Sequence, residues 1–314
     1  MQIALQSMLF VGGLGLALLA SDRAVAYTRA LAAALRLPAF VVGVALVSIG
    51  TDLPEIANSI AAHLQGEGDI NVGDSVGSTL TQYTLVLGLF PLVIAVILID
   101  RRSVVAVSVL TMTGLAMTIG FVADGWLARW EGGLLVLAWG VFTWIVVRAA
   151  PSLIADEAPH VKRQGRLVQA GIVLLALAIV GVGATVAVRA LVRLAELAGV
   201  PEFIIAFFGA SLGTSAPEIV VDLTALLRGA PGIALGDVLG SSLVDATLSI
   251  GVGPIVAPAA VTPRLAIVGS LYSLVAIGVV GALLAARRRH DRRSGFVLLG
   301  LYAFAYVVLL GARE

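Results

Sequence analysis

Apolar residues run through this chain in long blocks, which short polar or charged stretches separate. Blocks of about 20 residues predict helices that cross a membrane. We predict ten such spans, with an error of a few residues at each boundary. They cover residues 3–20, 38–64, 71–98, 103–122, 126–148, 167–188, 200–227, 233–259, 263–286 and 295–311.

A polar pattern inside four of these blocks occurs twice. Residues 48–55 (SIGTDLPE) and 73–82 (GDSVGSTLTQ) return as 211–218 (SLGTSAPE) and 236–245 (GDVLGSSLVD), and the offset in residue number is the same for both. Residues 38–91 match 201–254 at 21 of 54 positions without a gap, mostly at Gly, Pro, Ser, Thr, Glu and Asp. Paired apolar segments interrupted by Gly and Pro indicate the binding site of a secondary transporter.

The first motif predicts a broken helix. Pro54 has no N–H and disfavours helix at Leu53, whereas Pro suits the first turn of a new helix. We therefore expect the second span to break near Gly50–Leu53 and to restart at Pro54. A break at membrane depth is tolerated only next to protein or a water-filled cavity, and it leaves backbone carbonyls able to bind a cation.

Glu55 and Glu218 are the strongest candidates for function. A carboxylate near the bilayer centre is costly unless it is paired, protonated or bound to a cation, and the four repeat spans contain no Lys or Arg. We expect the two to face one ion from opposite sides. Asp52 and Ser215 have two interpretations, as ion ligands and as helix caps. The second arises because each stands three residues before a Glu, which is the spacing of a helix-capping box.

The helix after each break adds further oxygen ligands. Residues four apart share a helix face, and both faces carry acidic, hydroxyl or amide groups. Gly77 and Gly240 would let this face approach a neighbouring backbone. Oxygen ligands without nitrogen or sulfur suit a hard cation such as Ca²⁺, Mg²⁺ or Na⁺. The two faces consist of Asp74, Ser78 and Gln82, and of Asp237, Ser241 and Asp245.

Composition agrees with a membrane protein, since 60% of the residues are hydrophobic and 12% are charged. The chain has no cysteine, which excludes disulfides and thiolate metal sites, and only three histidines, none expected to be a ligand. We therefore predict no enzymatic cofactor.

The distribution of Lys and Arg predicts the orientation. Alternate loops carry 15 and 5 of the 20 basic residues, and the richer side should face the cytoplasm. Both termini then lie outside, and the first span is an uncleaved helix. Five spans precede the basic linker at about 149–166 and five follow it. We therefore expect an all-α membrane protein of two inverted five-helix halves, residues 1–155 and 156–314, with broken helices at the midplane.

With these motifs the chain resembles the calcium/cation antiporter superfamily, and most closely its prokaryotic sodium/calcium exchanger branch. That branch carries G-T-S-x-P-E and G-N-x-x-G-S-x-x-x-N/D in each repeat. The resemblance implies cation coordination by Thr51, Glu55, Ser78, Thr214, Glu218, Ser241 and Asp245, and a sodium site with Ser215 and the backbone near Ala210 and Ser211. Four residues depart from the pattern: Asp52 for Ser, Gln82 for Asn, and Asp74 and Asp237 for Asn.

The function that follows is a secondary cation antiporter, most simply of Ca²⁺ and Na⁺, in the inner membrane of a prokaryote. We include Asp52 and Gln82 among its ion ligands, and Asp74 and Asp237 as secondary candidates. Its partners would be inorganic cations and the bilayer, with no nucleic acid. Exchange coupled to protons, transport of another divalent ion and a passive cation channel remain alternatives. An intramembrane aspartyl protease fits poorly, because Gly73-Asp74 and Gly236-Asp237 lack the first Gly of its G-x-G-D motif and no span contains Tyr-Asp.

Overall fold

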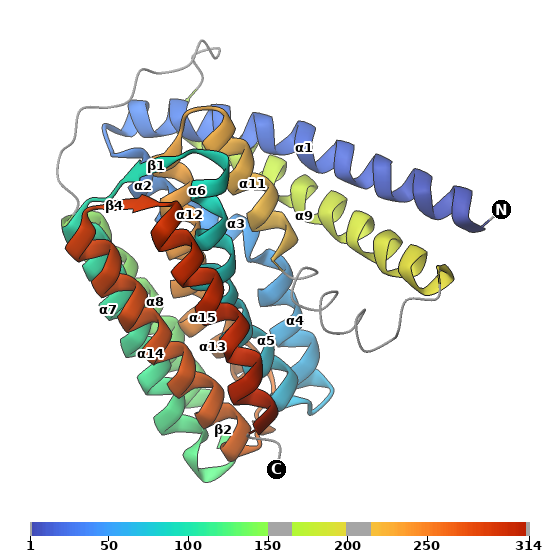
Figure 1. Ribbon diagram of the computed structural model, residues 1–314. Coiled ribbons are helices and arrows are strands. Elements are labelled where there is room, and N and C mark those ends of the chain that lie inside the picture. The colour runs from blue at the N-terminus through green and yellow to red at the C-terminus, as the bar shows by residue number, and fades with distance from the viewer. Residues whose placement is uncertain (1, 150–164, 199–214, 312–314) are drawn as a thin grey trace. The chain divides into compact units, whose positions relative to one another are not determined.

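The computed structural model describes residues 2–149, 165–198 and 215–311, which are mostly helical (Figure 1). Within these residues, helices account for the long apolar blocks, as the hydrophobic pattern predicted, and the part of the predicted span 200–227 before residue 215 lies outside them. The first half contains α1 (Gln2–Leu35), α2 (Ala39–Val42), α3 (Ser48–Thr51), α4 (Leu53–Leu64), α5 (Gly68–Thr81), α6 (Leu87–Val93), α7 (Arg101–Phe121) and α8 (Arg129–Ala149). The second contains α9 (Arg166–Leu197), α11 (Ala216–Leu227), α12 (Pro231–Val244), α13 (Ile250–Val256), α14 (Pro263–Arg287) and α15 (Arg292–Gly311).

Seven helical stretches in the described residues are long and apolar enough to cross a membrane, or eight with the broken pair Ala39–Thr51 and Leu53–Leu64. Two helices run well beyond the predicted spans: α1 ends at Leu35 rather than near 20, and α9 at Leu197 rather than near 188. The polar residues in the second part of α1 do not end this helix, because α11 and the residue that follows it provide polar partners for some of them. Ser21 hydrogen-bonds Thr224 at 2.7 Å, and Asp22 forms an ion pair with Arg228.

Four short strands, which the sequence analysis did not predict, form two antiparallel ribbons. Strand β1 (Val96–Leu98) pairs with β4 (Arg289–Asp291), and β2 (Trp126–Leu127) pairs with β3 (Ala259–Ala260). The all-α expectation is therefore corrected at these connections between helices. The strand positions follow the sequence repeat as well. The number of residues from the start of β1 to the start of β3 equals the number from β2 to β4. Both equal the offset between the two sequence motifs.

Helix boundaries repeat at the same offset, both within residues 38–91 and beyond them. The π-helical turns η2 (Gln82–Val86) and η4 (Asp245–Ser249) occupy corresponding positions, as do the short helices α6 and α13 that follow them. Helices α8 and α15 also begin at corresponding residues. The duplication therefore extends over local structure that the identity of the two sequences did not indicate.

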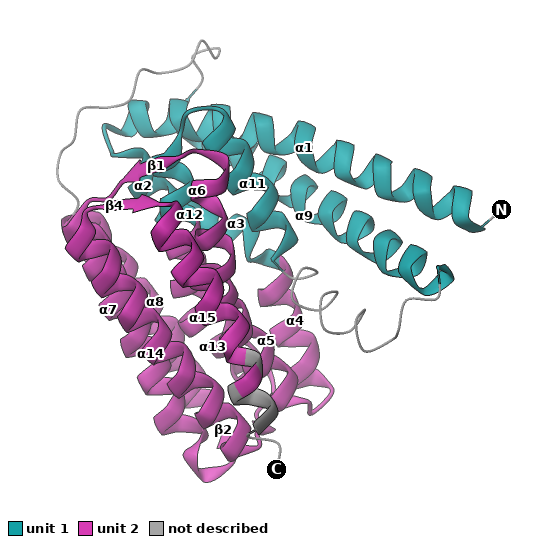
Figure 2. Cartoon of the chain, viewed as in Figure 1, with its two compact units in different colours: residues 1–53, 152–237 teal, residues 54–151, 238–314 magenta. Residues whose placement is uncertain are grey.

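The chain forms two compact units, and each takes segments from both halves of the sequence (Figure 2). Unit 1 comprises residues 1–53 and 152–237, and unit 2 comprises residues 54–151 and 238–314. In unit 1, α1 packs along α9, and Gly13 and Gly183 face each other there. A Cβ on Gly13 would lie 2.7 Å from the carbonyl oxygen of Gly183, so this crossing requires residues without side chains.

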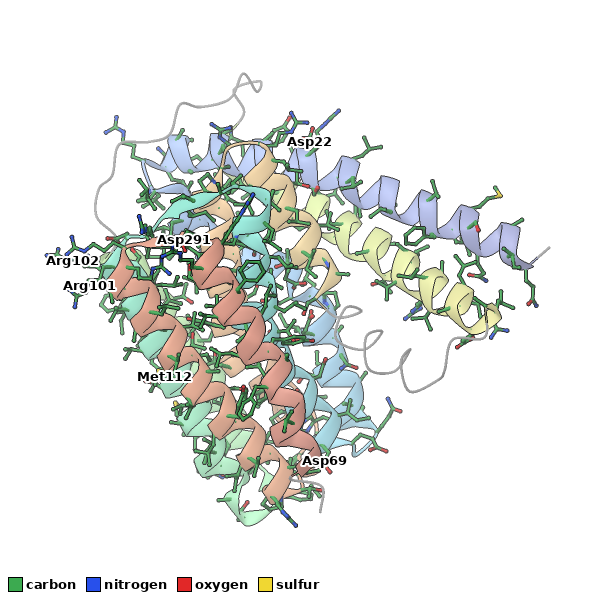
Figure 3. All side chains as sticks on the ribbon, in the orientation of Figure 1. Asp22, Asp69, Arg101, Arg102, Met112 and Asp291 are labelled. Carbon is green, nitrogen blue, oxygen red and sulfur yellow. The ribbon has the colours of Figure 1, made fainter. Side chains whose placement is uncertain are left out.

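In unit 2, α7 packs against α14, α8 against α13 and α6 against α15. Asp291 lies at the same end of this unit as Arg101 and Arg102, whereas Asp69 lies at the opposite end (Figure 3). Asp69 accepts hydrogen bonds there from the backbone N–H and the hydroxyl of Thr262, next to the start of α14. The ends of this unit are thus fixed by side-chain bonds to the connections.

His290, in β4, stabilises the end of unit 2 where Arg101 and Arg102 lie. Its Nε2 lies 2.7 Å from the carbonyl oxygen of Leu87, and its Nδ1 lies 2.8 Å from Oγ of Ser294. The carbonyl can only accept, so the neutral ring donates from Nε2 and accepts at Nδ1. Burial lowers the pKa of His290, and the positive charge of Arg287 lowers it further. The hydrogen bond to the Leu87 carbonyl and the negative charge of Asp291 raise the pKa but do not cancel this effect.

We expect acid to destabilise the protein through His290. A lowered pKa means that the unfolded chain takes up the proton first, so the stabilisation is complete above about pH 6.5 and is lost as the pH falls towards the folded-state pKa. The melting temperature in detergent should fall between pH 7.5 and 5.5. His290→Gln should flatten that dependence, and an equal slope in the variant would contradict the assignment.

Candidate ion-binding site

The predicted helix break lies where the motif placed it. Helix α3 ends at Thr51, Asp52 follows with φ −80° and ψ 6°, and α4 begins at Leu53. The restart comes one residue earlier than predicted, because Pro54 occupies the second position of the first turn, which also tolerates a missing N–H. The break therefore puts Glu55 in the first turn of α4.

The second motif has the same local design. Ser215 stands at the N-cap position of α11, Pro217 lies in its first turn and Glu218 follows it. Ser215 makes no capping hydrogen bond with its side chain, so the capping-box interpretation is wrong for this residue. Its buried hydroxyl remains available to a ligand. Thr214, Ala210 and Ser211 lie outside the described residues.

Two carboxylates of the motif come close together in unit 1. One carboxylate oxygen of Asp52 lies within 4.8 Å of one of Glu218, and both residues are fully buried. Like charges at this separation and burial repel strongly. A cation between them would remove this cost, and the position of Asp52 therefore favours its interpretation as part of the ion site.

Thr51 and Asp237 are joined in the same unit. The Thr51 hydroxyl donates to Oδ1 of Asp237 at 3.2 Å, and both side chains are buried. Asp222, which the sequence analysis missed, lies against Asp237 and near Glu218. Its spacing was a usable signal, because a residue four positions after Glu218 shares its helix face.

In unit 2, Glu55, Ser78, Ser241 and Asp245 are buried, each at most 3% exposed. Helix α5 packs against η4, which brings the faces of the two repeated helices together. The π-helical turns begin at Gln82 and at Asp245 themselves. Such turns are frequent at functional sites because the extra residue displaces the helix face.

Gln82 and Asp74 have protein partners. The Ser242 hydroxyl donates to Oε1 of Gln82 at 2.9 Å, and the Asn58 amide donates to Oδ2 of Asp74 at 2.7 Å. Asp74 is only half-buried, whereas Asp237, its counterpart in the second repeat, is fully buried. The two secondary candidates, equivalent in sequence, therefore have different surroundings.

The chemistry of both groups of residues suits a hard cation. The candidate ligands are carboxylate, hydroxyl and amide oxygens, and the segments that carry them contain no Lys or Arg. A buried carboxylate in such a segment needs a bound cation, a proton or a hydrogen-bond donor to offset its desolvation.

Comparison with known proteins agrees with this chemistry. The family model of the sodium/calcium exchanger protein matches residues 6–148 and 168–311. Inner membrane protein YrbG of Escherichia coli is 29% identical over 94% of this chain and 94% of its own length. Sodium/calcium exchanger MaX1 of Methanosarcina acetivorans is 24% identical over 92% and 94%. The solved structure of the sodium-calcium exchanger NCX_Mj has a TM-score of 0.80 at 23% identity, covering 97% of this chain and 99% of that one.

Proposed function

This chain belongs to the sodium/calcium exchanger protein family and is a cation antiporter, and from that membership we propose that it exchanges Ca²⁺ for Na⁺ at the carboxylates of its two repeat motifs. The observation that carries the proposal is the buried pair Asp52 and Glu218, with oxygens within 4.8 Å. Glu55 occupies the position of Glu218 in the first repeat, so repeat symmetry gives both the same role.

Exchange follows from the cost of an empty site. Buried carboxylates without a cation are too expensive to carry between the two faces of the membrane, so the carrier changes its exposure only when loaded. Ca²⁺ and Na⁺ both take oxygen ligands and would compete for them. The chemistry needs no cofactor.

We further propose ten spans in two inverted halves, residues 1–155 and 156–314, joined by the linker at about 149–166. The recurrence of helix and strand boundaries at the offset of the sequence repeat supports this duplication. An odd number of spans in each half inverts the second half relative to the first. The excess of Arg at one set of loops supports a cytoplasmic position for that side, with both termini outside and the protein in the inner membrane of a prokaryote.

Uptake of ⁴⁵Ca²⁺ into proteoliposomes tests the proposal. Vesicles loaded with Na⁺ and diluted into K⁺ should accumulate ⁴⁵Ca²⁺, and vesicles without a Na⁺ gradient should not. Uptake driven instead by a proton gradient would support proton-coupled exchange, and flux without any counter-ion gradient would support a channel. Uptake that ignores both gradients would contradict antiport.

The proton-coupled alternative has one observation in its favour, which is the additional carboxylate of Asp52 beside Glu218. Clustered carboxylates hold protons more tightly than isolated ones, so protons would compete with metal. We expect Asp52→Ser, which restores the family residue, to shift the pH profile of ⁴⁵Ca²⁺ uptake towards acid and to strengthen its dependence on Na⁺.

Asp52→Asn separates charge from size in this experiment, since it should reproduce the shift while keeping the shape of the side chain. If Asp52 only caps α4, Ser should replace it with little loss, because the two residues are similar in N-cap preference. An unchanged pH profile with intact uptake would therefore assign Asp52 to capping.

A further inference from the structure

Asp222 is a fully buried carboxylate that the exchange site described above does not use. It lies one helical turn after Glu218 on α11, and its carboxyl group meets that of Asp237 on α12. The charge of Glu218 acts on it as well. Three acidic side chains thus converge in one buried part of unit 1.

Asp222 lacks the donors that normally accompany a buried carboxylate. Neither of its oxygens accepts a hydrogen bond from an N–H or hydroxyl group of the described residues. Its contact with Asp237 becomes a hydrogen bond only if one of the two carboxyl groups carries a proton. With both ionised, the pair requires a cation.

The first repeat contains an internal comparison. The counterpart of Asp237 is Asp74, which accepts a hydrogen bond from the amide of Asn58. The counterpart of Asp222 is Ser59, whose hydroxyl accepts a bond from the backbone N–H of Gly253 at 3.1 Å. These groups accept hydrogen bonds from protein donors, whereas neither oxygen of Asp222 does so from the described residues, and the need for a positive charge therefore arises at Asp222.

We propose that Asp222 and Asp237 form a second cation site, which takes one hard divalent cation of the Ca²⁺ type. Two carboxylates carry two negative charges, which a divalent ion neutralises and a monovalent ion leaves half compensated. The Thr51 hydroxyl orients Asp237 by donating to its Oδ1. Asp237 is also a secondary candidate of the exchange site, so Asp222 is the residue that distinguishes this second site from it, and an ion held at Asp222 need not be transported.

Equilibrium binding of ⁴⁵Ca²⁺ to the purified full chain in detergent tests the site. Asp222→Ser, which introduces the residue of the first repeat, should bind one equivalent of Ca²⁺ fewer than the wild type. Asp237→Asn should lose the same equivalent. The matched control is Glu131→Gln, which removes a buried carboxylate that accepts a hydrogen bond from the backbone N–H of Ala128 and should leave the stoichiometry unchanged.

Asp222→Asn keeps the size of the side chain and should also lose one equivalent, which guards against a folding defect in the Ser variant. An unchanged Ca²⁺ stoichiometry in folded Asp222→Ser and Asp222→Asn protein would overturn the site and leave the pair sharing a proton. Failure of Na⁺-driven uptake would contradict the exchange proposal alone, because binding at Asp222 is measured without transport.

Discussion

Replacing either Glu55 or Glu218 by Gln is expected to abolish ⁴⁵Ca²⁺ uptake while the protein still folds. Each change removes one negative charge and keeps the shape of the side chain. A unit charge interacts with another at 4 Å by about 4 kcal/mol at an effective dielectric constant of about 20, and twice that for a divalent ion. A loss of about 100-fold requires only about 2.8 kcal/mol, so uptake should fall at least that far in Na⁺-loaded proteoliposomes.

Glu131→Gln is the matched control. Glu131 is also a buried glutamate, 6% exposed, but it accepts a hydrogen bond from the backbone N–H of Ala128 at the start of α8. We expect its Gln variant to retain uptake. The Glu55 and Glu218 variants should elute and melt like the wild type, because removal of a buried charge relieves its desolvation. Uptake retained in either one would remove that residue from the ion site.

The broken helix and its glutamates could be predicted because Pro, Gly and Glu act locally. Pro54 cannot continue the preceding hydrogen-bond pattern, and the break appears before it in the structure. The same reasoning failed at residue 20, where apolar character declines but α1 continues to Leu35. There the decisive contact, Ser21 with Thr224, joins residues 203 positions apart, which a local pattern cannot contain.

The rest of the site could not be predicted, because residues at equivalent positions in the two repeats have different partners. Asp74 and Asp237 align perfectly in the two repeats, yet one pairs with Asn58 and the other with Thr51 and Asp222. The residues that decide the difference are neighbours on another helix. The π-helical turns at Gln82 and Asp245 had no sequence signal either, because a π turn arises from packing and has no characteristic residue.

Gly236→Ala is the second change for which we expect a large effect, and the effect is on folding. Gly236 of α12 lies against the backbone of unit 1, where an added Cβ would overlap the carbonyl oxygen of Phe40 and lie 3.0 Å from Cα of Gly43. Overpacking costs about 1–3 kcal/mol, and the upper end applies because the obstacle is backbone. At about 2–4 °C per kcal/mol, the melting temperature in detergent should fall by roughly 6–12 °C.

Gly73→Ala provides the comparison, because Gly73 is the counterpart of Gly236 in the first repeat and an added Cβ there meets no atom of the described residues within 4 Å. Ala is favoured over Gly inside a helix by about 1 kcal/mol, so this variant should melt at or slightly above the wild-type temperature. If both variants melted alike, the close approach of α12 to Phe40 and Gly43 would be wrong. If only Gly236→Ala lowered the melting temperature, the equivalent glycines of the two repeats would be shown to have different packing roles.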